Sequence, residues 1–327
     1  MAPPEALADA PVWSRQVLDE ARRRIEPFVH RTPVLTSSTL DERLGARVFF
    51  KCENFQKIGA FKIRGATNAL RSMDPERRAR GVVTHSSGNH AQAVALAARS
   101  LGVAAHVVMP RTAPAVKRAA VAGYGAHILP CEPTLAAREE TTAAVIEETG
   151  AVLVHPYNDA AIIAGQATAA MELVEDVPGL DVVLVPVGGG GLAAGTGLAV
   201  SYLSPETRVV GAEPTGADDA FRSFEAGRIV PVATPTTIAD GLLATVGTLT
   251  FPLLREHLER IVTVTDEQIV AAMRFLWERL KIVVEPSGAV PLAALLTGEL
   301  DLRGRRVGVI LSGGNVDLER LPWTAGG

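Results

Sequence analysis

The chain has 327 residues, of which 47% are apolar and 21% charged, and its formal net charge is −4. This length is too great for one small domain and suits two α/β lobes in an ordinary globular protein. A weakly negative chain without a Lys/Arg cluster excludes nucleic-acid partners and a basic membrane-binding face. The two cysteines, Cys52 and Cys131, are too few for a disulfide framework, so we expect free thiols and a cytoplasmic protein.

No segment predicts a targeting peptide or a membrane span. Residues 1–29 lack a continuous apolar stretch, because Glu5, Asp9 and Asp19 interrupt it. Residues 182–200 carry no charge and are nearly long enough to cross a bilayer, but they contain a proline and six glycines. We expect a buried strand, a glycine loop and the start of a helix there.

Short apolar runs predict strands, and amphipathic segments between them predict helices. The expected strands are Arg47–Lys51, Val82–His85, Ala105–Met109, His127–Pro130, Val152–His155, Val182–Val187, Arg208–Ala212 and Val307–Leu311. The expected helices include Ala91–Leu101, Ala115–Ala122, Leu135–Glu148 and Glu267–Leu280. This alternation predicts an α/β fold with parallel sheets, right-handed crossovers and helices on both faces.

The alternation also predicts how the chain divides into lobes. It is compact between residues 81 and 156, where four strands and three helices are expected. We therefore predict a small domain over residues 81–156. Residues 1–80 and 157–327 are predicted to form a larger, discontinuous domain from both ends of the chain.

Lys62 stands after a glycine turn and at the start of an expected helix, in the segment 53–66 (ENFQKIGAFKIRGA). A lysine amine forms a Schiff base with an aldehyde, and desolvation lowers its pKa so that it also serves as a base. A solvated surface lysine is the plain alternative, which these residues alone do not exclude.

The run Ser86-Ser87-Gly88-Asn89-His90 follows the strand Val82–His85 and opens the next helix. Amides and hydroxyls at a helix start favour an anion such as a carboxylate. An ordinary serine N-cap is the alternative. No pair among His85, His90 and His155 has the helical spacing of metal ligands, so we expect packing or polar contacts from these histidines.

Four consecutive glycines, Gly188 to Gly191, follow the strand Val182–Val187 and precede a helical segment. Glycines there let the backbone approach a phosphate, and the helix-start amides bind it. A tight turn is the alternative. The loop also fits the dinucleotide fingerprint, with Glu213 about 20 residues further on, so by itself it leaves an NAD-binding oxidoreductase open.

The loop from Glu213 to Asp219 follows the strand Arg208–Ala212. Its carboxylates and the carbonyls between them suit a hard divalent cation, which prefers oxygen ligands. A solvated acidic turn is the alternative.

Four motifs together are similar to those of one enzyme family. F-K-I-R-G-A at residues 61–66, S-S-G-N-H at 86–90, the tetraglycine at 188–191 and S-G-G-N at 312–315 resemble the fold-type II pyridoxal-phosphate enzymes. The nearest resemblance is to serine racemases and to serine/threonine or hydroxyaspartate dehydratases, and it extends from Arg31 to Asp317. It implies a two-lobed, tryptophan-synthase-β-like fold and a homodimer.

The resemblance implies roles around the cofactor. Lys62 would hold the aldehyde as a Schiff base and, once released, move the substrate's Cα proton. Phe61 would pack against the ring, and Asn89 would hydrogen-bond the ring hydroxyl. Ser312 would face the pyridine nitrogen and leave it unprotonated, which favours loss of the β-hydroxyl over a long-lived carbanion. The phosphate would be held by the amides of Gly188, Gly189, Gly190, Gly191 and Leu192.

The resemblance also implies substrate and metal sites. Arg138 matches an arginine that responds to ligand in serine racemases. Glu213, the Ala217 carbonyl and Asp219 match a Mg²⁺ or Ca²⁺ site, an assignment that removes Glu213 from the NAD hypothesis. Relatives commonly have Thr and Ser where this chain has Ile58 and Ala60, and the nucleotide effector site of animal racemases uses that neighbourhood, so the resemblance does not imply nucleotide regulation here. The substrate carboxylate would lie at Ser86, Ser87, Gly88 and His90.

The predicted activity is a pyridoxal-phosphate-dependent dehydration of L-threonine, L-serine or L-threo-3-hydroxyaspartate to the 2-oxo acid and ammonia. One alternative is a serine or aspartate-type racemase that uses Lys62 and Ser87 on opposite faces of the substrate. The remote alternatives are an NAD-binding oxidoreductase, which rests on the glycine pattern alone, and a binding module without catalysis.

Overall fold

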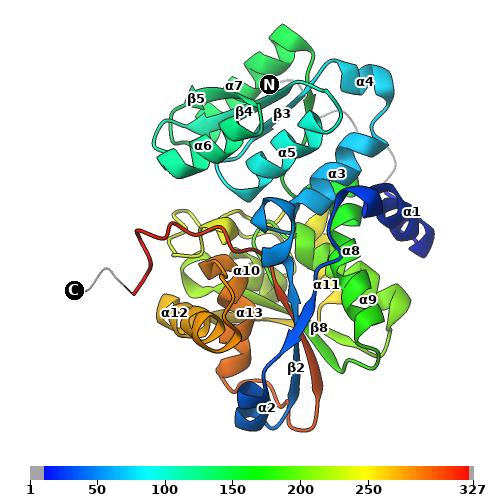
Figure 1. Cartoon of the computed structure of the whole chain (residues 1–327), viewed down its shortest axis with the longest axis vertical. Helices are drawn as coiled ribbons and strands as arrows, with labels where there is room; N and C mark the ends of the chain where they lie inside the picture. The colour runs from blue at the N-terminus through cyan, green and yellow to red at the C-terminus, as the bar shows by residue number, and fades with distance from the viewer. Residues whose placement is uncertain (1–10, 324–327) are drawn as a thin grey trace.

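The computed structural model describes residues 11–323, which form two sheets placed one above the other (Figure 1). The larger sheet has the strand order β1-β2-β10-β7-β8-β9 and the smaller β5-β4-β3-β6. The larger sheet contains β1 (Val34–Thr36), β2 (Arg47–Cys52), β7 (Val182–Pro186), β8 (Arg208–Pro214), β9 (Arg260–Val264) and β10 (Arg306–Leu311). The smaller contains β3 (Val82–His85), β4 (Ala105–Pro110), β5 (His127–Cys131) and β6 (Val152–Leu153).

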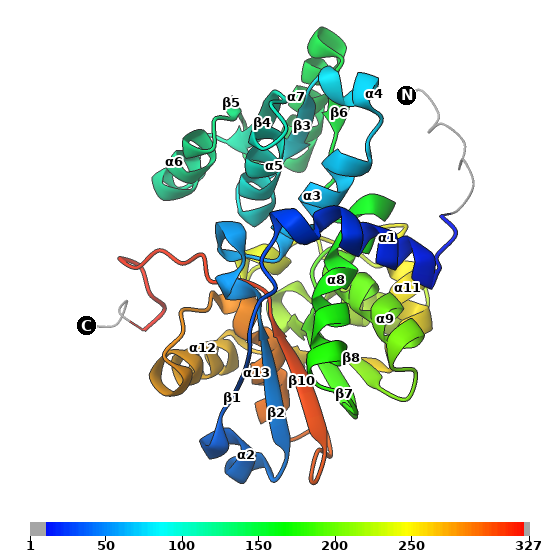
Figure 2. The same ribbon diagram turned by 45° about the vertical axis from the view of Figure 1, so that its right-hand side comes forward.

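Helices cover both faces of each sheet (Figure 2). One face of the larger sheet carries α1 (Arg15–Ile25), α8 (Ala160–Asp176), α9 (Gly191–Leu203), α10 (Asp219–Ala226) and α11 (Thr250–His257). The other face carries α2 (Ser38–Leu44), α12 (Asp266–Phe275) and α13 (Pro286–Leu296). Around the smaller sheet lie α5 (Asn89–Arg99), α6 (Ala115–Gly123) and α7 (Leu135–Thr149), and α3 (Lys62–Ser72) and α4 (Pro75–Ala79) lead into it.

The predicted α/β class with parallel sheets is confirmed. Each predicted strand is present, with ends that differ from the prediction by at most two residues. The exception to parallel pairing is β1, which runs antiparallel to β2. The prediction of one helix over Glu267–Leu280 is wrong in detail, because α12 ends at Phe275 and a π-helical turn follows over Leu276–Leu280. That turn stops at Lys281, whose φ of 59° is left-handed.

None of the helices within residues 11–323 has the length and apolarity needed to cross a bilayer. The uncharged stretch 182–200 forms β7, the glycine loop and most of α9, all of it buried in the large lobe. The smaller sheet lies wholly within residues 82–153. We retain residues 81–156 as the proposed small domain.

The carboxyl ends of the parallel strands meet between the two sheets, where α3 begins. The turn before Lys62 is tied to the end of β10, because the Phe61 amide donates to the Ser312 carbonyl at 3.0 Å. The Gly314 amide donates to the Gly59 carbonyl at 2.9 Å. Ligands of open α/β sheets bind at this edge. Most of the predicted site residues follow a strand that ends here.

Four charged side chains are buried together beside α3. Arg64 donates to Glu53 and to Glu172, each at 2.7 Å, and Lys51 donates to Glu172 at 2.6 Å. Arg64 and Lys51 are both fully buried. Although burial alone raises the pKa of Glu172, the hydrogen bond and charge of Arg64 lower it below the ordinary value. Two cations thus balance two anions, and α3 is fixed to β2 and α8.

We predict that Arg64→Met lowers the free energy of unfolding by about 3–5 kcal/mol, because Glu53 and Glu172 lose their main cation while buried. Urea unfolding followed by circular dichroism measures this change. The matched control is Arg208→Met, since Arg208 pairs with Glu259 while its side chain is 45% exposed. That exposed pair contributes less than about 1 kcal/mol. An equal decrease in the free energy of unfolding of the two variants would mean that the buried cluster contributes little to stability.

Candidate active site

Lys62 is the first residue of α3, and its amine lies at the junction of the two sheets. The glycine turn that the sequence predicts precedes it, and both Ile58 (φ 62°) and Gly59 (φ 70°) are left-handed there. The Nζ atom donates to the Pro156 carbonyl at 2.7 Å. Burial lowers the pKa of Lys62 to about 8, although the nearby Glu285 acts in the opposite direction. A nucleophilic or basic lysine requires such a shift.

The glycine loop presents a row of unused donors. The backbone N–H groups of Gly188, Gly189, Gly190, Gly191 and Leu192 donate to no atom of residues 11–323, and all five residues are buried. They lead into the N-terminus of α9, where Gly190 has a φ of 90°. Buried amides without acceptors are costly, and a bound anion satisfies them. A phosphate group therefore fits this loop.

Phe61 and Ser312 lie together on the side of Lys62 formed by the end of β10. The Lys62 amine is 5.2 Å from the centre of the Phe61 ring. Ser312 is 3% exposed, and its hydroxyl makes no hydrogen bond within the described part of the chain. A buried hydroxyl with a free donor and acceptor is chemically able to face a ring nitrogen, and this role of Ser312 stays a prediction.

Asn89 lies at the start of α5, and its partners include a residue that sequence motifs do not reveal. Its Nδ2 donates to Glu285 at 2.8 Å, and its Oδ1 accepts from Asn315 at 2.8 Å. Glu285 is 4% exposed, and burial raises its pKa to about 8. Asn315 belongs to the S-G-G-N motif, but Glu285 lies in an apolar stretch whose local pattern carries no functional signal.

The predicted carboxylate-binding run lies at the end of β3. The amides of Asn89, His90 and Ala91 donate to no atom of the described residues, whereas the Gly88 amide donates to Ser86 Oγ at 3.4 Å. The Ser87 side chain makes no hydrogen bond within residues 11–323. The His90 ring is buried beside the Val154 carbonyl at 3.1 Å, the packing and polar contact that the sequence predicts, so its amide is the group that remains for a substrate.

Arg138 lies near the end of β3, where an aromatic row adjoins it. The rings of His85 and His155 are 6.0 Å apart, and those of His155 and Tyr157 are 4.7 Å apart. Burial lowers the pKa of His155 to about 4, so this ring is neutral near pH 7. The half-buried Arg138 has no carboxylate within ion-pair distance among the described residues, and its Nε has no hydrogen-bond partner there.

The two carboxylates of the predicted metal loop are both buried. Glu213 accepts from the amides of Ala220 and Phe221 at 3.0 and 2.9 Å, and Asp219 accepts from Val246 at 2.9 Å. Burial raises the pKa of Glu213 well above its usual range and that of Asp219 to about 6. Each carboxylate oxygen of Glu213 thus accepts one amide hydrogen bond and keeps a lone pair for one further partner.

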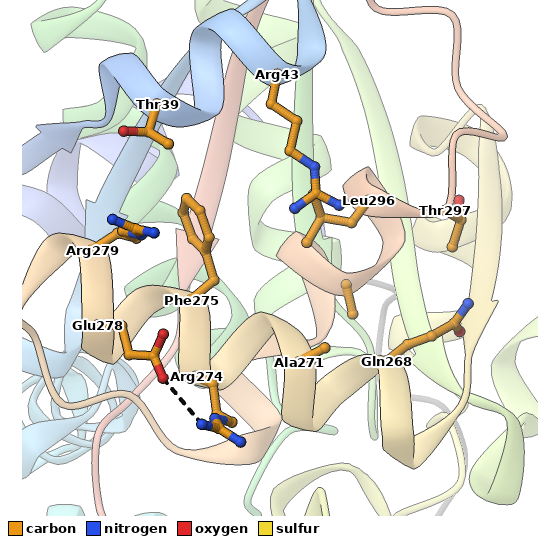
Figure 3. Close-up of a pocket in the computed structure, with 11 residues that line it drawn as sticks. Thr39, Arg43, Gln268, Ala271, Arg274, Phe275, Glu278, Arg279, Leu296 and Thr297 are labelled. Carbon is orange, nitrogen blue, oxygen red and sulfur yellow. Dashed lines mark hydrogen bonds and ion pairs between the residues drawn. The ribbon is translucent and has the colours of Figure 1, made fainter.

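A cavity of about 630 Å³ lies away from these residues, between α2, α12 and α13 (Figure 3). Arg43 and Arg279 contribute its cationic groups, and Arg274 pairs with Glu278 at 3.3 Å. None of the predicted site residues lines it.

Comparisons with known proteins agree with this geometry. The family described as pyridoxal-phosphate dependent enzyme matches residues 25–313. A beta-hydroxyaspartate dehydratase of Paracoccus denitrificans (strain Pd 1222) is 54% identical over 303 residues, which cover 93% of this chain and 96% of that protein. A serine racemase of Dictyostelium discoideum is 49% identical over 308 residues, covering 93% and 95%. The structure of maize serine racemase has a TM-score of 0.93 at 48% identity, covering 96% and 97%.

We predict that cofactor-free protein takes up pyridoxal phosphate covalently with a rate that rises as pH passes through about 8. Only the neutral amine attacks an aldehyde, and the lowered pKa of Lys62 makes it neutral above that pH. Stopped-flow absorbance between pH 6 and 10 measures the rate. Lys62→Ala abolishes the uptake, and Lys57→Ala, in the same segment, retains it. A midpoint near 10.4, about that of an ordinary lysine, would contradict the prediction.

Proposed function

Since the chain belongs to the pyridoxal-phosphate-dependent enzymes, we propose that it is an ammonia-lyase that dehydrates a 3-hydroxy amino acid, with β-hydroxyaspartate as the preferred substrate. L-Threonine and L-serine are the lesser substrates in this proposal. The observation that carries it is the set of unused donors around Lys62, which fits the cofactor and one substrate carboxylate.

Each group of the site has a task in this reaction. When bound, pyridoxal phosphate supplies an electron-withdrawing ring attached to the substrate amine. Lys62 would carry the cofactor through its amine and, once released, its Nζ would accept the proton from the substrate Cα. The amides from Asn89 to Ala91 would hold the α-carboxylate, and those from Gly188 to Leu192 would hold the phosphate. In the net reaction the β-hydroxyl leaves as water and one water is consumed in releasing the amino group, so the products are the 2-oxo acid and ammonia.

Arg138 supports β-hydroxyaspartate as the substrate because this substrate carries a second carboxylate. The Arg138 guanidinium lies near His85 at the end of β3 and has no carboxylate partner among the described residues. The similarity to the beta-hydroxyaspartate dehydratase of Paracoccus denitrificans, at 54% identity, also supports this substrate. A half-buried charge without an ion-pair partner destabilises the protein. The distal carboxylate of β-hydroxyaspartate would be such a partner for the Arg138 guanidinium.

We predict that Arg138→Ala lowers kcat/KM for β-hydroxyaspartate at least tenfold and that for L-serine less than threefold. A hydrogen bond to a charged group contributes about 1.5–3 kcal/mol, which corresponds to roughly tenfold or more. Formation of the 2-oxo acid measures both activities, and Arg99→Ala, an exposed arginine of the same domain, is the control. Equal losses on the two substrates would remove the proposed role of Arg138 in specificity.

Racemisation is the second candidate activity. It is supported by the similarity to serine racemases and by the Ser87 side chain, which makes no hydrogen bond within residues 11–323. We propose that this hydroxyl donates a proton on the substrate face opposite Lys62. Elimination needs no donor on that face, so we propose that it exceeds racemisation on a hydroxylated substrate. Chiral analysis of the same reactions separates the two activities.

We also propose a Mg²⁺ or Ca²⁺ ion at Glu213, Asp219 and the Ala217 carbonyl. No group of three or more His, Cys, Asp or Glu side chains within residues 11–323 is arranged to hold a metal, so a carbonyl is needed beside the two carboxylates. Both carboxylates are buried, and neither forms an ion pair with a cationic side chain in the described structure. A hard cation would offset that burial.

We predict that a chelator lowers the melting temperature and that millimolar Mg²⁺ or Ca²⁺ restores it. A ligand at about 100 times its Kd stabilises a protein by about 2.7 kcal/mol. Asp219→Asn removes this response, whereas Asp218→Asn keeps it, because Asp218 pairs with Arg222 and is not a proposed ligand. Scanning calorimetry measures the shifts. If both variants lose the change in melting temperature, the cation is attracted by the general negative charge of the loop and is not held by the proposed ligands.

We propose, finally, a homodimer in the cytoplasm. Phe55 and Val283 are large apolar side chains, 46% and 44% exposed. They lie near each other, because Asn54, next to Phe55, donates to the Val283 carbonyl at 3.1 Å. Exposed apolar neighbours favour burial against a second subunit. The cytoplasmic location is supported by the two free, buried cysteines.

A further inference from the structure

The side-chain amide of Asn89 is held at both ends. Its Nδ2 donates to Glu285 Oε1 at 2.8 Å, and its Oδ1 accepts from Asn315 Nδ2 at 2.8 Å. Asn315 Nδ2 also donates to the Ile58 carbonyl at 2.7 Å, so both of its hydrogens are used. Ile58 is in the turn that precedes Lys62. The amide orientation is therefore coupled to the backbone that carries the reactive lysine.

This arrangement allows only one orientation of the Asn89 amide. Reversed, its nitrogen would face the Asn315 nitrogen, which brings two donors together, and its oxygen would face the Glu285 oxygen, which brings two acceptors together whenever Glu285 is ionised. In the observed orientation one N–H of Asn89 is used by Glu285 and the other remains free. Asn89 thus offers a donor, and not an acceptor, for a further partner.

Glu285 is itself rigidly placed. Its amide donates to the Gly313 carbonyl at 3.0 Å, and a side chain at position 313 would collide with its carboxyl group. No cationic side chain of the described residues lies within ion-pair distance of it. Asp240, Lys117 and Lys62 are the charged groups near enough to act on it, and Lys117 pairs with Asp240 across the two sheets. Neutral or ionised, a carboxyl group keeps an acceptor oxygen for Asn89.

We propose that Glu285 is a positioning residue that acts through Asn89: it holds the Asn89 amide so that its remaining N–H donates to the ring hydroxyl of the cofactor. This inference rests on the proposed pyridoxal-phosphate function and adds a residue to it. What the reaction needs from Glu285 is an acceptor oxygen, and its negative charge is not required. Glu285 does not touch the reacting atoms.

The test is a double-mutant cycle on cofactor binding, without turnover. Cofactor-free protein is titrated with pyridoxal phosphate, and both the dissociation constant and the visible absorbance band of the bound cofactor are recorded. We expect Glu285→Leu and Asn89→Ala each to raise the dissociation constant about tenfold and to shift the band alike. The double variant is expected to stay within about twofold of Asn89→Ala, because the two residues act in series.

Two single variants act as matched comparisons. Glu285→Gln keeps an acceptor oxygen and is expected to bind within about threefold of the wild-type protein, whereas a tenfold loss would overturn the acceptor role. Asp240→Asn removes a nearby carboxylate that does not contact Asn89, and binding is expected to be unchanged. Circular dichroism establishes that each variant folds. If Glu285→Leu does not fold, Asn315→Ala takes its place in the cycle, since it releases the other end of the same amide.

The possible results distinguish a failure of the Glu285 proposal from a failure of the proposed pyridoxal-phosphate function. A wild-type protein that binds no pyridoxal phosphate contradicts the proposed function. Normal binding by the wild type together with unchanged affinity and absorbance in Glu285→Leu contradicts the positioning role alone. Additive losses in the double variant would also overturn it, because Glu285 would then act independently of Asn89.

Discussion

The placement of α3 between the two sheets depends on the buried cluster of Arg64, Glu53, Glu172 and Lys51. An arginine with its guanidinium shared between two carboxylates has little freedom, because its planar fork fixes the direction of each hydrogen bond. Arg64 stands two residues after Lys62, so the first turn of α3 cannot rotate without breaking the cluster. The lysine that the chemistry requires is thus fixed by charges that take no part in that chemistry.

Lys51 and Lys62 show how burial can serve two purposes. Lys51 is fully buried but reaches Glu172 at 2.6 Å, so its charge is balanced within the core. Within residues 11–323, Lys62 has the Pro156 carbonyl at 2.7 Å as its one hydrogen-bond acceptor. Desolvation without an ion pair favours the neutral amine, which is why the pKa of Lys62 falls to about 8. Lys51 therefore stabilises the fold, whereas the lowered pKa of Lys62 makes its amine reactive toward an aldehyde.

Much of this architecture could be predicted from the sequence because its strands are apolar, β-branched and bounded by turn residues. Some of the elements that were not predicted from the sequence lack such a local signal. α8 and α13 are buried on nearly all sides and show no polar stripe, and β9 follows a highly charged segment. Glu285 could not be found in this way, since it meets Asn89 across 196 residues of sequence. Its role depends on a contact that only the folded chain creates.

The glycine loop shows why a glycine pattern alone is weak evidence for a ligand. A side chain at position 189 would collide with Tyr157, and one at position 190 with Thr250, so protein packing by itself already demands glycine at these positions. The evidence for an anion lies instead in the five buried amides that find no acceptor in the described structure. Those amides distinguish a binding loop from a tight turn, because a turn built only for packing would leave fewer buried donors unsatisfied.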